Sequence, residues 1–173
     1  MDIRQRVLAG AAASILSASV VSAQAARHLR RADSEFITAA AQGGLAEVEM
    51  GRVALQHGSN DAVKRFGQRM IEDHSKTTEE LKGIASQKGI AVPSAVNIKQ
   101  KAAMDRLSHL NGTAFDRAYM RDMIRDHREH AAWFHKEANH GVDPDLKGFA
   151  GRTLPTLQED LRMARDTLGQ VKK

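Results

Sequence analysis

The fold is decided by a short phrase that occurs twice: residues 70–74 read MIEDH, and residues 123–127 read MIRDH. Each copy lies in a long stretch where large apolar residues recur at intervals of three and four, which is the spacing of one helix face. His74 and His127 therefore share a face with the apolar residues around them. Because an unpaired polar group is costly to bury, the two histidines predict a shared polar site inside a helical bundle.

The same periodicity continues over nearly the whole chain after residue 33, and no stretch alternates with the period of two that marks a strand. We expect helices over residues 33–57, 61–88, 94–110, 113–139 and 143–168, with Ser94 capping the third. Tight turns join the first pair and the last pair of long helices, whereas about 20 residues separate the two pairs. The prediction is an all-α, ferritin-like four-helix bundle with a short extra helix in a long crossover connection. The two copies of the repeated phrase would then lie on parallel helices.

Residues 1–25 have the features of a cleaved signal peptide. Arg4 and Arg6 precede an apolar stretch over residues 7–18, and small residues near positions 21–25 suit signal peptidase. That stretch is short and interrupted by serines, which disfavours a permanent membrane span. Residues 26–173 are expected to form one domain with its core over about 33–169. We expect an exported protein, most simply periplasmic, with outer-membrane association or secretion as the other destinations.

The composition limits the chemistry and the partners. The chain has no cysteine, which excludes disulfides, thiolate metal sites and cysteine nucleophiles. Its formal net charge is +5 and is spread along the helices, so an envelope protein or an anionic membrane surface is the partner class that it suits. Aromatic residues make up only 4% of the chain, which argues against nucleic acid as a partner. The oligomeric state is not predicted.

Each long helix carries one polar residue on or beside its apolar face when residues are placed at 100° intervals. These residues are Glu47, His74, His127 and Asp160, and His130 lies one turn beyond His127. Counting residues from the tight turns places neighbouring members within about 5–6 Å of one another in height. Side chains of this length can bridge such an offset. The sequence thus predicts a Glu/His/His/Asp cluster inside the bundle, with His130 as an auxiliary member.

Carboxylates and imidazoles that converge in a bundle core are suitable ligands for one divalent transition metal, such as Fe, Mn, Zn or Cu. The Glu-x-x-His pair of diiron bundles is missing, because Ile71 and Ile124 stand three residues before the two histidines. A second hypothesis is a structural or interaction module, in which the cluster only sets the helix register through buried hydrogen bonds. A third is a metal-dependent redox enzyme with an open coordination position beside Tyr119.

Several segments together resemble a known family. They include AEVEMG at residues 46–51, VKRF at 63–66, the two repeated phrases, and LPTL at 154–157. This combination is similar to the bacterial exported "domain of unknown function 4142" family, whose members are labelled as outer-membrane or secreted proteins. The resemblance covers about residues 33–169. It implies a ferritin-like bundle in the cell envelope with no established catalytic activity.

The resemblance also draws attention to Glu47, His74 and His127, which match recurrent polar positions of the family. In the last helix it implies a histidine where this chain has Asp160. A carboxylate there is shorter and harder as a ligand than imidazole, so the expected consequence is weaker binding, a preference for another metal, or loss of the site. Our leading hypothesis is an exported, non-enzymatic protein that binds a divalent metal or serves in envelope stress.

Overall fold

The computed structural model describes residues 31–171, and in this range it contains helices and no strands. The N-terminal helix spans residues 31–57. It is followed by α2 (Asp61–Gln87), α3 (Ile98–Ser108), α4 (Gly112–His140) and α5 (Pro144–Gln170). The expected signal peptide at residues 1–25 lies outside the described residues. Within them, no helix combines the length and apolar character that crossing a bilayer requires.

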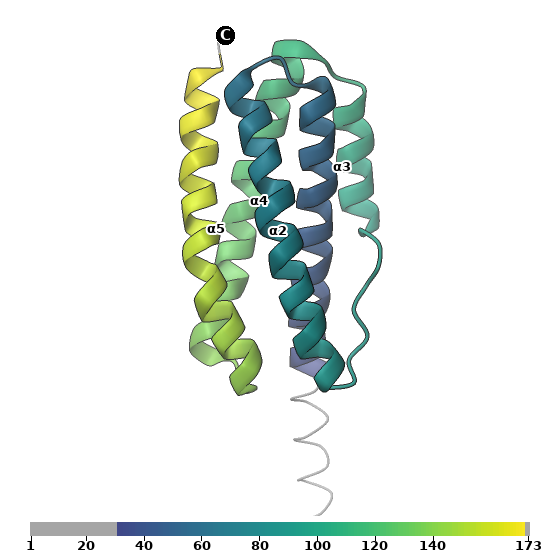
Figure 1. Ribbon diagram of the computed structural model, residues 1–173, viewed down its shortest axis with the longest axis vertical. Helices are drawn as coiled ribbons and strands as arrows, with labels where there is room; N and C mark the ends of the chain where they lie inside the picture. The colour runs from purple at the N-terminus through teal and green to yellow at the C-terminus, as the bar shows by residue number, and fades with distance from the viewer. Residues whose placement is uncertain (1–30, 172–173) are drawn as a thin grey trace, which may run out of the picture.

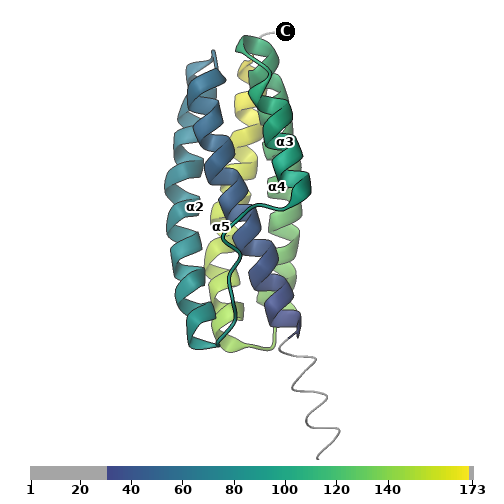
Figure 2. The ribbon, with the colours of Figure 1, turned by 90° about the vertical axis from the view of Figure 1, so that its right-hand side faces the viewer.

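The four long helices form the predicted ferritin-like bundle, and α3 is the extra helix in the crossover (Figure 1). The N-terminal helix and α2 are antiparallel, as are α4 and α5. The connection after α2 returns part of the way along the bundle and α3 covers the rest, so that α2 and α4 run parallel (Figure 2). This topology places both copies of the repeated phrase on parallel helices, as the sequence predicted.

The starts of α2 and α5 follow their predicted capping residues, but the expected start of the first helix at residue 33 is wrong, because residues 31 and 32 are already helical. Asn60 caps α2 by accepting a hydrogen bond from the backbone N–H of Ala62, and Asp143 caps α5 just before Pro144. The predicted cap of the extra helix at Ser94 is wrong. Asn97 caps α3 instead, because its side chain and that of Gln100 each bond the other residue's backbone N–H, which satisfies two free donors at once.

A polar layer separates two apolar cores within the bundle. One core is built around Met50, Met70 and Met123 near the first tight turn. The other is built around Leu81 and Phe134 near the second tight turn. The sequence positions of Glu47, His74, His127 and Asp160 fall between the two cores on their respective helices.

Small residues bring the N-terminal helix and α2 close together on both sides of this layer. A Cβ atom added at Gly51 would lie 2.6 Å from the carbonyl oxygen of Gly67, and one added at Gly44 would lie 2.5 Å from Oγ1 of Thr78. A larger residue at Gly51 would press on the α2 backbone and move a helix, whereas one at Gly44 would first displace the Thr78 side chain. Glu47 and His74 lie between the crossings, so their side chains are held within contact distance.

Candidate metal centre

The structure brings all five predicted site residues into one cluster. Glu47 comes from the N-terminal helix, His74 from α2, His127 and His130 from α4, and Asp160 from α5. The structure buries Glu47, His74, His127 and Asp160, whereas 22% of the His130 side chain is exposed. One polar side chain from each long helix therefore reaches the same level of the bundle.

The two buried histidines lie between two carboxylates. Nδ1 of His74 lies 2.7 Å from Oε2 of Glu47, and its Nε2 lies 3.8 Å from Oδ2 of Asp160. His127 is placed in the same way, with Nδ1 3.5 Å from Oε1 of Glu47 and Nε2 3.9 Å from Oδ2 of Asp160. The ring centroids are 5.6 Å apart and the rings are nearly perpendicular. Both edges of each imidazole thus face a carboxylate.

Hydrogen bonds fix the Nδ1 side of the cluster, where Glu47 lies. His130 donates from Nδ1 to Oε1 of Glu47 at 2.9 Å. His127 donates from Nδ1 to the backbone oxygen of Met123 at 2.9 Å, which leaves a lone pair on its Nε2. A metal-binding histidine commonly anchors its other nitrogen in this way.

Arg69 is a further member of the site that sequence analysis missed. Its Nε donates to Oδ1 of Asp160 at 2.7 Å and lies 3.3 Å from Oδ2 of Asp73. Burial raises the pKa of Asp160, and the bond to Arg69 opposes that rise. The i, i+4 spacing of Arg69 and Asp73 was a visible signal for a surface pair, but nothing local indicated that the arginine reaches α5.

Several buried polar atoms around the histidines have no hydrogen-bond partner. They are Oε2 of Glu47, Nε2 of His74, Nε2 of His127, Oδ2 of Asp160 and the hydroxyl of Tyr119. Oε2 of Glu47 nevertheless lies 2.7 Å from Nδ1 of His74, and this contact helps to raise the pKa of the histidine. Native proteins leave few buried polar atoms unpartnered, and a concentration of them commonly indicates an ion or a water molecule.

The charges in the cluster are strongly coupled. Burial alone would raise the pKa of Glu47, but the neighbouring His74, His130 and His127 outweigh burial and hold this pKa well below its ordinary value. Burial opposes protonation of His74 and His130, yet Glu47 outweighs it and raises the pKa of both. Burial prevails at His127 and lowers its pKa. Without metal, the cluster therefore holds an ionised carboxylate beside two histidines that favour protonation.

Aromatic side chains close the site toward the first tight turn. Phe66 packs edge-on against His127 and against Tyr119, which in turn stacks on Phe115. Burial raises the pKa of Tyr119 far above its ordinary value, so the phenol stays protonated and can donate a hydrogen bond. The apolar wall limits the entry of water from this end of the bundle.

Two solved structures that resemble this chain are DUF305 proteins. The chain resembles a DUF305 fragment from Deinococcus radiodurans with a TM-score of 0.72 at 15% identity, over 80% of this chain and 96% of that chain. It resembles a DUF305 protein from Streptomyces coelicolor, described as a candidate secreted protein, with a TM-score of 0.69 at 16% identity, over 80% of this chain and 91% of that chain. Identity at this level shows a shared fold alone. No curated protein matches the chain. A family model described as "Domain of unknown function (DUF4142)" matches residues 18–167, and the chain belongs to this family.

Proposed function

We propose that this protein binds one divalent transition-metal ion between its four long helices, in the cell envelope. The observation that carries the proposal is the set of unpartnered buried nitrogen and oxygen atoms around His74 and His127. A cluster that served only to satisfy itself by hydrogen bonds would leave few such atoms. A metal ion would engage several of them at once.

The donor atoms fit a transition metal in type and in spacing. Ligands about 2.0–2.2 Å from one ion lie about 3–3.5 Å from each other. The nitrogen-to-oxygen separations in the cluster range from 2.7 to 3.9 Å. Ligand atoms of Glu47, His74 and His127 all lie within 4.8 Å of one another. Small side-chain rotations would bring such a set to bonding distance.

The edge that carries Asp160 suits the ion better, because Nδ1 of His127 already donates to the backbone oxygen of Met123 and only its Nε2 keeps a lone pair. Asp160 faces both Nε2 atoms, whereas Glu47 faces both Nδ1 atoms. Glu47 would then accept the Nδ1–H of His74, while the backbone oxygen of Met123 accepts that of His127, and both contacts orient the imidazoles. Two carboxylates on opposite edges do not form the bridged pair of a diiron centre, so a single ion is the supported stoichiometry.

The envelope location rests on the N-terminal sequence and on the described relative. Residues 1–25 have the pattern of a cleaved signal peptide. The Streptomyces coelicolor DUF305 protein that shares the fold is described as a candidate secreted protein. Cell fractionation with N-terminal sequencing of the isolated protein tests export: the expected product begins near residue 26, and an intact Met1 in the cytoplasm would contradict it.

Metal content decides the binding proposal. The full chain is expressed with its own leader, purified without a histidine tag, and measured by elemental mass spectrometry. We expect about one transition-metal ion per chain, and less than a tenth of that in the His74→Gln/His127→Gln double variant. His135→Gln is the matched control, because this exposed histidine on α4 lies outside the cluster. Equal metal content in all three proteins, or none in the wild type after metal supplementation, would refute the proposal.

The second candidate function is a structural or interaction module, and the bonds from His130 to Glu47 and from Arg69 to Asp160 favour it. In this alternative the cluster sets the helix register, and an envelope partner binds elsewhere on the protein. It predicts the same melting temperature with and without chelator, and a large loss of stability in the double histidine variant. A chelator-sensitive melting temperature would exclude it as the sole role.

A further inference from the structure

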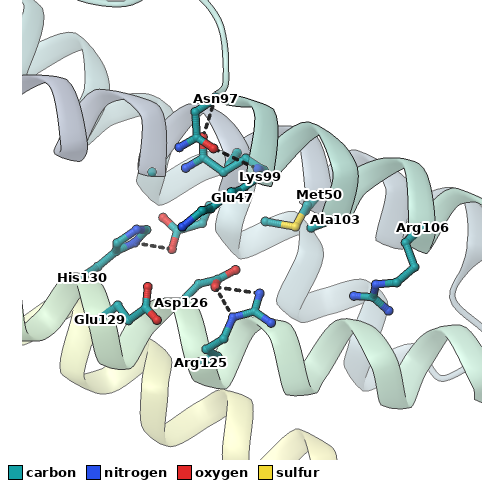
Figure 3. A pocket seen from close by; sticks show the side chains of 13 residues that line it. Glu47, Met50, Asn97, Lys99, Ala103, Arg106, Arg125, Asp126, Glu129 and His130 are labelled. Carbon is teal, nitrogen blue, oxygen red and sulfur yellow. Dashed lines mark hydrogen bonds and ion pairs between the residues drawn. The ribbon is translucent and has the colours of Figure 1, made fainter.

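A surface pocket of about 400 Å³ lies beside the cluster, between the N-terminal helix, α3 and α4. Ala103 and Asn97 line it on the α3 side, and Asp126 and Glu129 line it on α4. Figure 3 shows these two carboxylates next to His130, with the Glu47 side chain opposite. The crossover connection creates this pocket, because α3 covers a groove between two long helices without filling it.

Glu47 and His130 form the partition between this pocket and the interior. Both residues line the surface pocket, and both also line an inner void of about 20 Å³ that reaches His74. A water molecule needs about 10–15 Å³ of such space, so the void can hold one water or one ion. The 2.9 Å hydrogen bond from His130 to Glu47 closes the partition.

The position of His130 depends on a glycine that faces it. A Cβ atom at Gly43 would lie 2.6 Å from Cε1 and 2.7 Å from Nε2 of the His130 ring. The ring can therefore lie against the backbone of the N-terminal helix only because position 43 has no side chain. Glu47 contacts three histidines, and His130 has the most exposed side chain of these four residues.

At the Asp160 edge of the cluster, the positive charge of Arg69 lies between the carboxylate and solvent. Asp160 is fully buried, and the Arg69 guanidinium binds it from the solvent side with 34% of its own side chain exposed. A cation that approached along this path would meet a fixed positive charge. The pocket carries charges of both signs, with Asp126 and Glu129 beside Lys99, Arg106 and Arg125 (Figure 3), and Arg125 is paired with Asp126. Its distinction from the Arg69 edge is geometric, because Glu47 and His130 themselves line it.

We propose that this pocket is the entry route for the metal ion and that His130 controls passage; the inference rests on the metal-binding function proposed above. The pocket has room for an ion with its water shell, since each water needs only about 10–15 Å³. Passage requires His130 to release Oε1 of Glu47. Glu47, once freed from His130, would be the first ligand to meet an ion in the pocket, and His74 and His127 already contact its carboxylate.

Filling the pocket tests the route. Ala103→Trp places an indole in the pocket, whereas Ala102→Trp places the same group on the exposed side of α3. Uptake of Co²⁺ by metal-free protein is followed by its visible absorption in stopped flow, and release is followed after addition of excess chelator. We expect Ala103→Trp to slow both rates at least tenfold with unchanged stoichiometry. Ala102→Trp should stay within twofold of the wild type. Equal rates in the two variants would overturn the proposal.

Opening the partition gives an independent test. His130→Ala removes the bond to Glu47 and leaves a gap beside Gly43. We expect faster uptake and faster release, each by about tenfold or more, because passage no longer requires breaking a hydrogen bond to a charged group. A variant that accelerates release but leaves uptake unchanged would make His130 an ordinary ligand and refute its role in passage.

The two levels of proposal fail in different ways. If the wild type binds no Co²⁺ at equilibrium, the metal-binding function and the route are both wrong. If Co²⁺ binds at one ion per chain but neither Ala103→Trp nor His130→Ala changes the rates of uptake and release, only the route is wrong. Circular dichroism of each variant confirms that it is folded, and the His130→Ala rates decide the question if Ala103→Trp does not fold.

Discussion

Removing the charge of Glu47 should destabilise the metal-free protein strongly, and by an amount that depends on pH. Glu47 is fully buried and contacts His74, His127 and His130. Glu47→Gln keeps the shape of the side chain but leaves two histidines that favour protonation without their counter-charge. Breaking a buried ion pair from one side costs about 3–5 kcal/mol. For a domain of this size, that loss lowers the melting temperature by about 6–20 °C.

The pH dependence follows from the directions of the pKa shifts. The pKa of Glu47 is below its ordinary value of 4.5, so its contribution is complete above pH 4.5 and is lost as pH falls through the folded-state pKa. The pKa of His74 is above its ordinary value of 6.5, so its contribution is complete below pH 6.5 and is lost as pH rises through the folded-state pKa. The stability difference between wild type and Glu47→Gln should therefore be largest between pH 4.5 and 6.5.

Urea unfolding from pH 3 to 9 with chelator present measures this difference. Glu49→Gln is the matched control, because 43% of the Glu49 side chain is exposed and, within residues 31–171, its ion pair is with Arg52 on the same helix. The control should change the free energy of unfolding by less than about 1 kcal/mol. A loss below about 1 kcal/mol for Glu47→Gln, or a loss that keeps growing above pH 8, would refute the charge assignment of the cluster.

Three further predictions concern the metal, the helix crossing and the arginine. A metal ion at one hundred times its dissociation constant should stabilise the wild type by about 2.7 kcal/mol, as a calorimetric rise in melting temperature that chelator reverses; no rise would contradict binding. Gly51→Ala should cost about 1–3 kcal/mol in chemical unfolding and weaken metal binding, because its Cβ would lie 2.6 Å from the carbonyl oxygen of Gly67. Gly83→Ala should instead be neutral or stabilising, because an added Cβ there has nothing within 4 Å. Equal losses of stability in the two variants would show that the helix crossing at Gly51 is not the cause. Arg69→Met should destabilise the protein by about 1–3 kcal/mol through the uncompensated Asp160, and adding Asp160→Asn should recover most of the loss in a double-mutant cycle; simple additivity would refute their coupling.

The helices and their inner faces could be predicted from the sequence because both are local properties. A helix turns by a constant angle per residue, so the positions of apolar residues already place Glu47, His74, His127 and Asp160 on the inside. Turn lengths were sufficient for the topology, since a tight turn demands an antiparallel neighbour and a long connection permits a crossover. The cap at Asn97 was missed, because Ser94 and Asn97 are both good caps and only the path of the connection selects one of them.

The geometry of the site could not be predicted, because it depends on how separate helices approach one another. Residue counting left Glu47 and His74 at different heights, whereas the glycine crossings bring them to 2.7 Å. The bond from Arg69 to Asp160 joins positions 91 residues apart, and the pocket exists only where α3 lies over α4 and the N-terminal helix. The sequence alone determined which polar groups the bundle would bury, since helical periodicity is local. Tertiary packing decided which of their atoms meet, which stay unpartnered and which edge opens to solvent, because side-chain contacts depend on helix separations of a few ångströms.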